Sequence, residues 1–350
     1  MNYHSYEEEH CAEYLSRSED EHYFEDWDFT HNNDFGLVLT EGFEERTLGI
    51  LEKIGKSKIN LPAIAIGRYV PDIDSNRIYR ARLEELAELI SKGNWRVFAN
   101  YNDGRWVSDA INFVGTDSVL LDITSISNRG LFGAFDAASM SGKKIFIGYT
   151  EAGQYWPKRG DWQQLKEEIF NSSSIAEIVD KKPWLFGYEH HVELIPGHEG
   201  RDSAGCRRAL VGFLAYKCAR LGSILGKEDY SEFFFIAGRP RLEENSWRLE
   251  ALKDINEPIT KDRKVIEIRT FKYRKCFERL TSLLFQDDSL FLKYNVHLAI
   301  LGSKLQTAAC WALSSILTPI TVVTSIPAQY FPASFSEGVG VSWFFRLTIP

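Results

Sequence analysis

Five apolar segments in residues 34–157 recur in the same order in residues 190–333, and this repetition limits the possible folds more than any other pattern in the chain. In the first copy the expected strands are Gly36–Thr40, Ala63–Gly67, Arg96–Tyr101, Val119–Ile123 and Lys144–Tyr149, with helices beginning near Glu45, Arg77, Trp106 and Arg129. Short apolar runs that alternate with amphipathic stretches are typical of a mainly parallel α/β sheet. We therefore expect an α/β protein of two tandem Rossmann-like halves that arose by internal duplication and form a pseudo-dimer.

The clearest match between the copies is the second strand with its helix. AIAIGRYVPDIDSNRIYRARLEEL at Ala63–Leu86 and FFFIAGRPRLEENSWRLEAL at Phe233–Leu252 share a Gly-Arg exit and a later Arg-Leu-Glu. The first strand and turn, LVLTEGFEER and VELIPGHEGR, both place Gly, one residue, Glu and then Arg after an apolar run. Both copies close on Gln-Tyr-aromatic-Pro, which makes Tyr155 and Tyr330 counterparts.

These matches divide the chain into four parts. We expect an acidic N-terminal leader at 1–33, a first Rossmann-like half at 34–157, a connector at 158–189 and a second half at 190–350. The leader is interpreted as a mobile or loosely docked tail, with a partner-binding segment as the alternative. The apolar run VGVSWFFRL near the C-terminus is expected to finish the second sheet.

Composition excludes several classes of protein. The formal net charge of −8 argues against a clamp for extended nucleic acid, although it allows a small anion in a local basic pocket. Five cysteines without a CxxC pair, and no signal peptide, predict reduced thiols and a cytoplasmic protein. No apolar run approaches the roughly 18 residues of a membrane span. No motif for a metal, a dinucleotide or an ATP-hydrolysing P-loop is present, so no cofactor is expected and catalytic residues stay unknown.

Ligands of an open parallel sheet bind beyond the carboxyl ends of its strands, so the loops there carry the candidate residues. The first loop offers Gly42 and Arg46, matched by Arg201 in the second half. An arginine at a helix start can bind phosphate together with the amides of that helix, and a Glu-Arg pair that pins the turn is the alternative. The second loop offers Arg68 and Arg239, each after a glycine that permits a tight exit from the strand, with a salt bridge as the alternative.

The fourth loop carries the most hydroxyls. Asp122, Thr124, Ser125, Ser127 and Arg129 line it in the first half, and Gly302, Ser303 and Lys304 occupy the corresponding place in the second. Hydroxyls, amides and a cation at a helix start form a small anion cradle. Helix capping explains the serines alone but does not require the lysine.

The segment ILGSKLQTAA at Ile300–Ala309 resembles the fourth-strand signature of CRISPR-associated Rossmann fold (CARF) domains, and SAVED domains are two such units in one chain. The resemblance implies binding of a cyclic oligonucleotide or another phosphate-bearing nucleotide. It points to Gly302, Ser303 and Lys304, and less directly to Thr124, Ser125 and Ser127. The first half has Thr-Ser-Ile-Ser-Asn-Arg in place of the Gly-Thr-Lys turn.

These observations favour a non-enzymatic nucleotide sensor or scaffold subunit of a bacterial antiviral defence system. CARF-like proteins usually carry an effector domain and none is recognised in this sequence, so a protein partner is expected to supply that activity. One alternative is a metal-independent ring nuclease, or another nucleotide-processing enzyme, that uses Lys304 to stabilise charge on a phosphate. The other is a purely structural interaction platform, which burial of Arg46 and Arg201 in salt bridges would favour.

Overall fold

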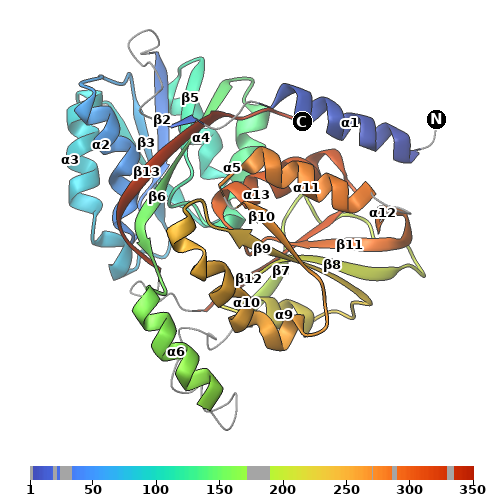
Figure 1. The fold of residues 1–350 in the computed structure, drawn as a ribbon. Coiled ribbons are helices and arrows are strands. Elements are labelled where there is room, and N and C mark those ends of the chain that lie inside the picture. Colours follow the sequence, from blue (N-terminus) through green and yellow to red (C-terminus); the bar gives the residue numbers. More distant parts are fainter. Residues whose placement is uncertain are drawn as a thin grey trace. The chain divides into compact units, whose positions relative to one another are not determined.

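The computed structural model describes residues 3–18, 22–23, 34–171, 190–269, 271–285, 290–328 and 335–350. The chain divides into two compact units (Figure 1). The N-half unit comprises residues 18–156 and 332–349, and the C-half unit comprises residues 1–17, 157–331 and 350. Within the described ranges, no helix is long and apolar enough to span a membrane.

The N-half unit is built on sheet A, with the strand order β1-β13-β6-β5-β2-β3-β4. Its strands are β1 (His22–Tyr23), β2 (Phe35–Thr40), β3 (Ile64–Tyr69), β4 (Trp95–Asn100), β5 (Ser118–Asp122), β6 (Lys144–Tyr155) and β13 (Ser336–Arg346). Strands β2 to β6 run parallel, whereas β13 is antiparallel to both β6 and β1. Every residue of β2 is buried, as expected of a central parallel strand with both faces covered.

Helices cover both faces of sheet A (Figure 1). On one face lie α2 (Gly49–Lys56) and α3 (Arg80–Ser91), each entered through a 3-10 turn, η3 (Glu45–Leu48) and η4 (Asp74–Arg77). On the other lie α4 (Trp106–Val114) and α5 (Asn128–Met140). The core contains Leu37 from β2, Ile54 from α2 and Leu83 from α3, each at most 1% exposed.

The C-half unit is built on sheet B, with the strand order β10-β9-β8-β11-β12-β7. Its strands are β7 (His190–Leu194), β8 (Arg207–Phe213), β9 (Glu232–Arg239), β10 (Val265–Arg269), β11 (Tyr294–Ala299) and β12 (Thr321–Pro327). Its helices are α1 (Tyr3–Arg17), α6 (Arg159–Asn171), α9 (Ala219–Leu225), α10 (Trp247–Thr260) with the preceding turn η5 (Glu243–Asn245), α11 (Tyr273–Phe285), α12 (Leu290–Lys293) and α13 (Lys304–Ile316). Strands β8 to β12 run parallel and β7 is antiparallel to β12.

The two sheets share one topology. Counted along the chain, the parallel strands of each unit lie in the order 3-2-1-4-5, as β4-β3-β2-β5-β6 and as β10-β9-β8-β11-β12, and each fifth strand carries an antiparallel partner. This is the order of a Rossmann-like sheet, so the predicted fold class, an α/β protein of two tandem Rossmann-like halves, is confirmed. All five strands predicted in the first half are present, and its helices begin within a few residues of the predicted positions.

The strand β13 lies in a different sheet from the one that the sequence pattern predicts. Its place in the chain suggests that it finishes sheet B, but it pairs with β6 of sheet A, and Phe344 packs into the core of the N-half unit. The edge strand β6 is 12 residues long and would otherwise present a row of unpaired backbone groups, which β13 satisfies. The predicted boundary at 190–350 therefore does not coincide with the C-half unit.

The acidic leader also differs from the expected loose tail. Its first part forms α1 (Tyr3–Arg17), which packs on α11 and α13 of the C-half unit. Cys11 and Tyr14 are at most 1% exposed, and the rings of Tyr14 and Phe277 lie 4.6 Å apart. With Glu7 and Ser18, both also buried, these positions follow the 3.6-residue period of a helix inside a segment dominated by charge. The second half of the predicted connector, residues 172–189, lies outside the described residues.

Candidate functional site

Seven of the predicted site residues come together at the carboxyl edge of sheet A, in the N-half unit. They follow or end the strands β2, β3 and β5 and are Gly42, Arg46, Arg68, Thr124, Ser125, Ser127 and Arg129. The sequence therefore located this edge correctly. The contacts of these residues decide whether their polar groups are available to a ligand.

Gly42 is required for close packing of two loops. A Cβ at Gly42 would lie 2.8 Å from both Cβ and Oγ of Ser125. The Tyr69 hydroxyl donates to the Ser125 carbonyl at 2.9 Å and accepts from the Ser127 amide at 3.1 Å, which holds the second loop in place. The loops after β2 and β5 thus pack against each other.

Arg46 is almost fully buried, at 7% exposure, and acts within the fold. Its Nη2 donates to Glu44 at 2.8 Å, and its Nη1 donates to the Thr150 carbonyl at 3.4 Å. The guanidinium also lies over the rings of Tyr149 and Tyr155, 5.9 and 5.7 Å from their centroids. These contacts favour the interpretation of Arg46 as a residue that pins the turn, and they place Tyr155 in packing.

Arg68 belongs to an ion-pair network at the carboxyl ends of β2 and β3. Its Nε donates to the buried carboxylate of Glu41 at 3.2 Å, and Arg80 donates to the same carboxylate at 2.9 Å. Arg80 also donates to Asp72, which joins this carboxylate to the network. Hydrogen bonds from Arg80 and Arg77 lower the pKa of Asp72 to about 2. Sequence reasoning missed Glu41, although an acid directly after a buried strand was a visible signal. The glycine before Arg68 leaves room for the Trp106 ring and does not adopt a positive φ.

Ser127 and Arg129 are committed to local structure. Ser127 is the N-cap of α5, and its hydroxyl accepts from the Gly130 amide at 2.9 Å and bonds Asn102 Oδ1. Arg129 Nη1 donates to the Asn102 carbonyl at 2.9 Å. The predicted anion site in the first half therefore has two of its side chains, Ser127 and Arg129, hydrogen-bonded to Asn102 in the loop after β4.

Asp122, the last residue of β5, is the most perturbed acid at this edge. It is 3% exposed and accepts hydrogen bonds from both the amide and the hydroxyl of Thr124, whose oxygen accepts in turn from the Thr150 amide at 2.9 Å. Burial raises the pKa of Asp122 to about 7, against the opposing effects of the Thr124 bonds and of Arg46. The carboxyl group can thus change charge near neutral pH inside the fold.

The carboxyl edge of sheet B brings together the predicted residues of the second half except Arg201. Arg239 ends β9, Gly302 and Ser303 lie between β11 and α13, and Lys304 begins α13. Ser303 caps α13 in a capping box, in which its hydroxyl accepts from the Gln306 amide and its amide donates to Gln306 Oε1 at 2.8 Å. A Cβ at Gly302 would collide with this Gln306 amide group.

Cations accumulate at this edge from successive strand-end loops. Lys217 follows β8, and Lys304 follows β11. Arg239 is the last residue of β9 and Arg241 follows it, while Arg269 is the last residue of β10 and Lys272 follows it. In the described parts of the same loops the acids are Glu243 and Glu244. Arg248, at the start of α10, lies over the rings of Tyr216 and Trp247, 4.8 and 5.3 Å from their centroids. The edge therefore offers positive charge beside aromatic surface.

The placement of Arg201 at a carboxyl edge is wrong. Arg201 is exposed and lies in the segment between β7 and β8, which leads into the amino end of β8. The neighbouring Ser203 amide donates to Asn295, near the start of β11, at 2.8 Å, which fixes the segment at the opposite edge of sheet B. The error arose because Val192–Leu194 belongs to the antiparallel strand β7, while the first parallel strand is β8. Tyr330 lies outside the described residues.

Comparisons with known proteins add little to this geometry. No protein-family model matches the chain, and no curated protein matches it. Among solved structures, a universal stress protein from Archaeoglobus fulgidus DSM 4304 is similar at 12% identity, covering 82% of this chain and 94% of that one, with a TM-score of 0.22. This likeness is too low to carry an argument, and none of the comparisons identifies a CARF or SAVED domain.

Proposed function

We propose that the C-half unit binds a phosphate-bearing nucleotide at the carboxyl edge of sheet B. The observation that carries the proposal is the set of six cations, Lys217, Arg239, Arg241, Arg269, Lys272 and Lys304, on loops that follow four adjacent parallel strands. Parallel strands bring these loops to one edge of the sheet, where anionic ligands of open α/β sheets bind. Lys304 stands at the first position of α13, where helix amides also favour an anion.

The two units differ in the charge of their strand-end loops, and this difference directs the proposal to the C-half unit. At the edge of sheet A, Arg46 pairs with Glu44, and Arg68 and Arg80 share Glu41. A phosphate there would have to displace a carboxylate that is already desolvated. At the edge of sheet B the described loops hold six cations and two acids, so an added phosphate meets net positive charge.

The ligand class follows from charge and aromatic surface together. The Tyr216 and Trp247 rings lie against Arg248 at the start of α10, on the same edge of the sheet, and aromatic rings next to cations suit a base and its phosphates. The segment at Ile300–Ala309 resembles the CARF signature, which favours a cyclic oligonucleotide. On this basis we assign the protein a role as a nucleotide sensor or scaffold subunit of antiviral defence, with effector activity in a partner protein.

Binding is tested by isothermal titration calorimetry and native mass spectrometry with a panel of cyclic di-, tri- and tetranucleotides. A bound nucleotide that loses about tenfold in affinity on Lys304→Ala supports the proposal, since one charge-assisted hydrogen bond is worth about that much. The matched control is Lys264→Ala, which removes an exposed lysine at the amino end of β10. No binding across the panel, or an equal loss with the control, contradicts the proposal.

A second candidate, a metal-independent ring nuclease at the same edge, is favoured by one observation. β7 runs antiparallel to β12, so His190 and His191 lie beside Pro327 and Ile326 at the carboxyl end of β12. The side chain of His191 is 75% exposed, with Nε2 3.9 Å from a Glu193 oxygen, and an imidazole there suits general acid-base work. Conversion of a bound cyclic nucleotide to a linear product, lost on His191→Asn, would establish the enzyme. A bound nucleotide that stays intact would favour the sensor over the enzyme.

A further inference from the structure

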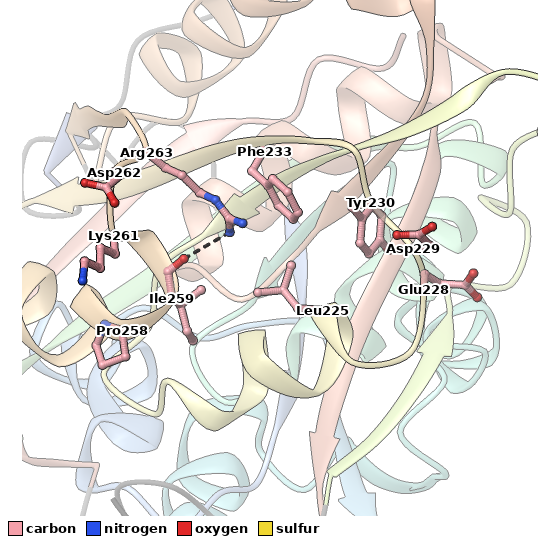
Figure 2. A pocket seen from close by; sticks show the side chains of 10 residues that line it. All are labelled: Leu225, Glu228, Asp229, Tyr230, Phe233, Pro258, Ile259, Lys261, Asp262 and Arg263. Carbon is pink, nitrogen blue, oxygen red and sulfur yellow. Dashed lines mark hydrogen bonds between the residues drawn. The ribbon is translucent and has the colours of Figure 1, made fainter.

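The C-half unit has an open pocket of about 610 Å³ at the amino edge of sheet B, the edge opposite the proposed nucleotide site (Figure 2). Two connections line it. One runs from the end of α9 into β9 and contributes Leu225, Glu228 and Phe233 with their neighbours. The other runs from the last turn of α10 toward β10 and contributes Pro258 and Lys261. Volumes of this order are common for sites that take small organic ligands.

The N-half unit provides an internal comparison, because the same connection there is filled. Between α2 and β3 the side chains of Ile59 and Leu61 are 9% and 3% exposed and belong to the core, and the Leu61 amide donates to the Ile90 carbonyl at the end of α3 at 3.0 Å. In the C-half unit the connection carries the exposed acids Glu228 and Asp229 in place of aliphatic side chains. The residues of this connection therefore differ between the two units, and the exposed acids belong to the C-half unit.

The two sides of the pocket differ in net charge. Figure 2 shows Lys261, Asp262 and Arg263 on one side, where two cations outnumber one acid, and the carboxylates of Glu228 and Asp229 on the other, with Leu225 between them. The floor is apolar and contains Leu225, Phe233, Ile259 and Pro258. A ligand that satisfies both sides therefore carries a positive and a negative group at the two ends of an apolar body.

Both sides of the pocket are held in place by contacts with their surroundings. The Arg263 guanidinium lies 3.8 Å from the Phe233 ring centroid and donates to the Ile259 carbonyl at 3.2 Å. On the acidic side Arg208 pairs with Glu228 at 3.3 Å, and the Tyr230 hydroxyl bonds His297 Nδ1 at 3.0 Å. A pocket whose walls are fixed in this way loses less conformational entropy when a ligand binds.

We propose that this pocket binds a small zwitterion with an apolar body, of which a free dipeptide with aliphatic or aromatic side chains is the simplest example. Its ammonium group lies toward Asp229 and Glu228, its carboxylate lies toward Lys261 and Arg263, and its side chains cover Leu225 and Phe233. The site is separate from the nucleotide site, because its lining residues come from the amino edge of sheet B and include none of the six cations of the carboxyl edge.

The test is a titration of the full-length protein with the dipeptide Leu-Phe at low salt. Binding is monitored by calorimetry or by the chemical shifts of the Tyr230 ring. We expect saturable binding that falls about fivefold on Lys261→Gln and on Asp229→Asn, the change expected for loss of one solvent-exposed ion pair. N-acetyl-Leu-Phe and Leu-Phe-amide, which each lack one charge, should bind about fivefold more weakly than Leu-Phe.

The matched control is Lys58→Gln, an exposed lysine in the filled connection of the N-half unit, which should leave binding unchanged. Absence of saturable binding, blocked dipeptides that bind as tightly as Leu-Phe, or an equal loss of affinity with Lys58→Gln would each overturn the proposal. Nucleotide binding measured on Lys261→Gln keeps the two proposals distinguishable. It is expected to be unchanged, whereas Lys304→Ala should leave dipeptide binding intact.

Discussion

The guanidinium of Arg220 donates two hydrogen bonds to the backbone carbonyl of Ser325, 2.9 Å from Nε and 2.7 Å from Nη2. Arg220 lies in α9, after the first parallel strand of sheet B, and Ser325 lies in the fifth, β12. In the N-half unit Arg46 occupies the turn after the first parallel strand and donates to the Thr150 carbonyl in the fifth, β6, at 3.4 Å. Each unit therefore uses an arginine to join these two strands.

The hydrogen-bond register shows that the two acceptor residues correspond. The Ile123 amide donates to the Gly148 carbonyl in the N-half unit, and the Ile300 amide donates to the Val323 carbonyl in the C-half unit. Each acceptor of the arginine lies two residues beyond that carbonyl. The structural counterpart of Arg46 is thus Arg220, in the first turn of α9 after β8, whereas the sequence pattern matches Arg46 with Arg201.

Replacing Arg220 with methionine should lower the free energy of unfolding by about 2 kcal/mol, because it removes two charge-assisted hydrogen bonds at the end of β12. Urea denaturation followed by circular dichroism measures the change. Arg201→Met, an exposed arginine of the same unit, is the control and should change stability by less than about 0.5 kcal/mol. Equal effects of the two substitutions would show that the Arg220 contact adds nothing to the free energy of unfolding.

Asp122 should make the protein less stable as the pH rises toward neutrality. Burial raises its pKa in the folded state from 3.8 to about 7, so between these values the folded state binds more protons than the unfolded state. Stability therefore falls as the pH rises through this window. Asp122→Asn keeps an oxygen for the Thr124 bonds and should remove this dependence, making the variant more stable than the parent protein at pH 8. Urea denaturation at pH 5 and pH 8 measures it, and identical pH dependence in both proteins would refute the assignment.

His297 should behave in the opposite sense. Burial lowers its pKa below 6.5, against the opposing hydrogen bond with Asp202, so the folded state binds fewer protons than the unfolded state below that pH. The stability it contributes is present above pH 6.5 and is lost as the pH falls below it. A titration of the His297 ring by NMR should give a midpoint below 6.5, identified by loss of the signal in His297→Gln. A midpoint at or above 6.5 would show that the Asp202 hydrogen bond outweighs burial at this ring.

Gly67→Ala should destabilise the N-half unit by about 1–3 kcal/mol, the usual cost of overpacking. A Cβ at this position would lie 2.5 Å from the Trp106 ring, which is 5% exposed and has little room to move. Urea denaturation measures the loss, and tryptophan emission should shift to the red if the ring is displaced. Gly160→Ala is the matched control, because nothing lies within 4 Å of a Cβ there and the residue is in α6. It should leave stability unchanged or raise it slightly.

The local elements of this protein could be predicted from its sequence. Buried strands and amphipathic helices have different periods of apolar residues, and these periods can be read from neighbouring positions alone. The helix start at Lys304 was visible for the same reason, since a serine followed three residues later by glutamine is a local capping signal. The repeat then predicted two Rossmann-like halves, because both copies contain the same predicted strands and helices in the same order.

Only the tertiary structure decided which sheet a strand joins and what surrounds a charged side chain. The apolar run in β13 reads as a strand in either sheet, and its contact with β6 joins Thr150 to Ser342, 192 residues apart. Likewise, Arg46 and Lys304 look alike as cations after a strand, yet one is buried against Glu44 and the other lies at a basic edge. Pairing between distant strands and partners depends on contacts that no local window of the sequence contains, and these contacts set the burial of every charge.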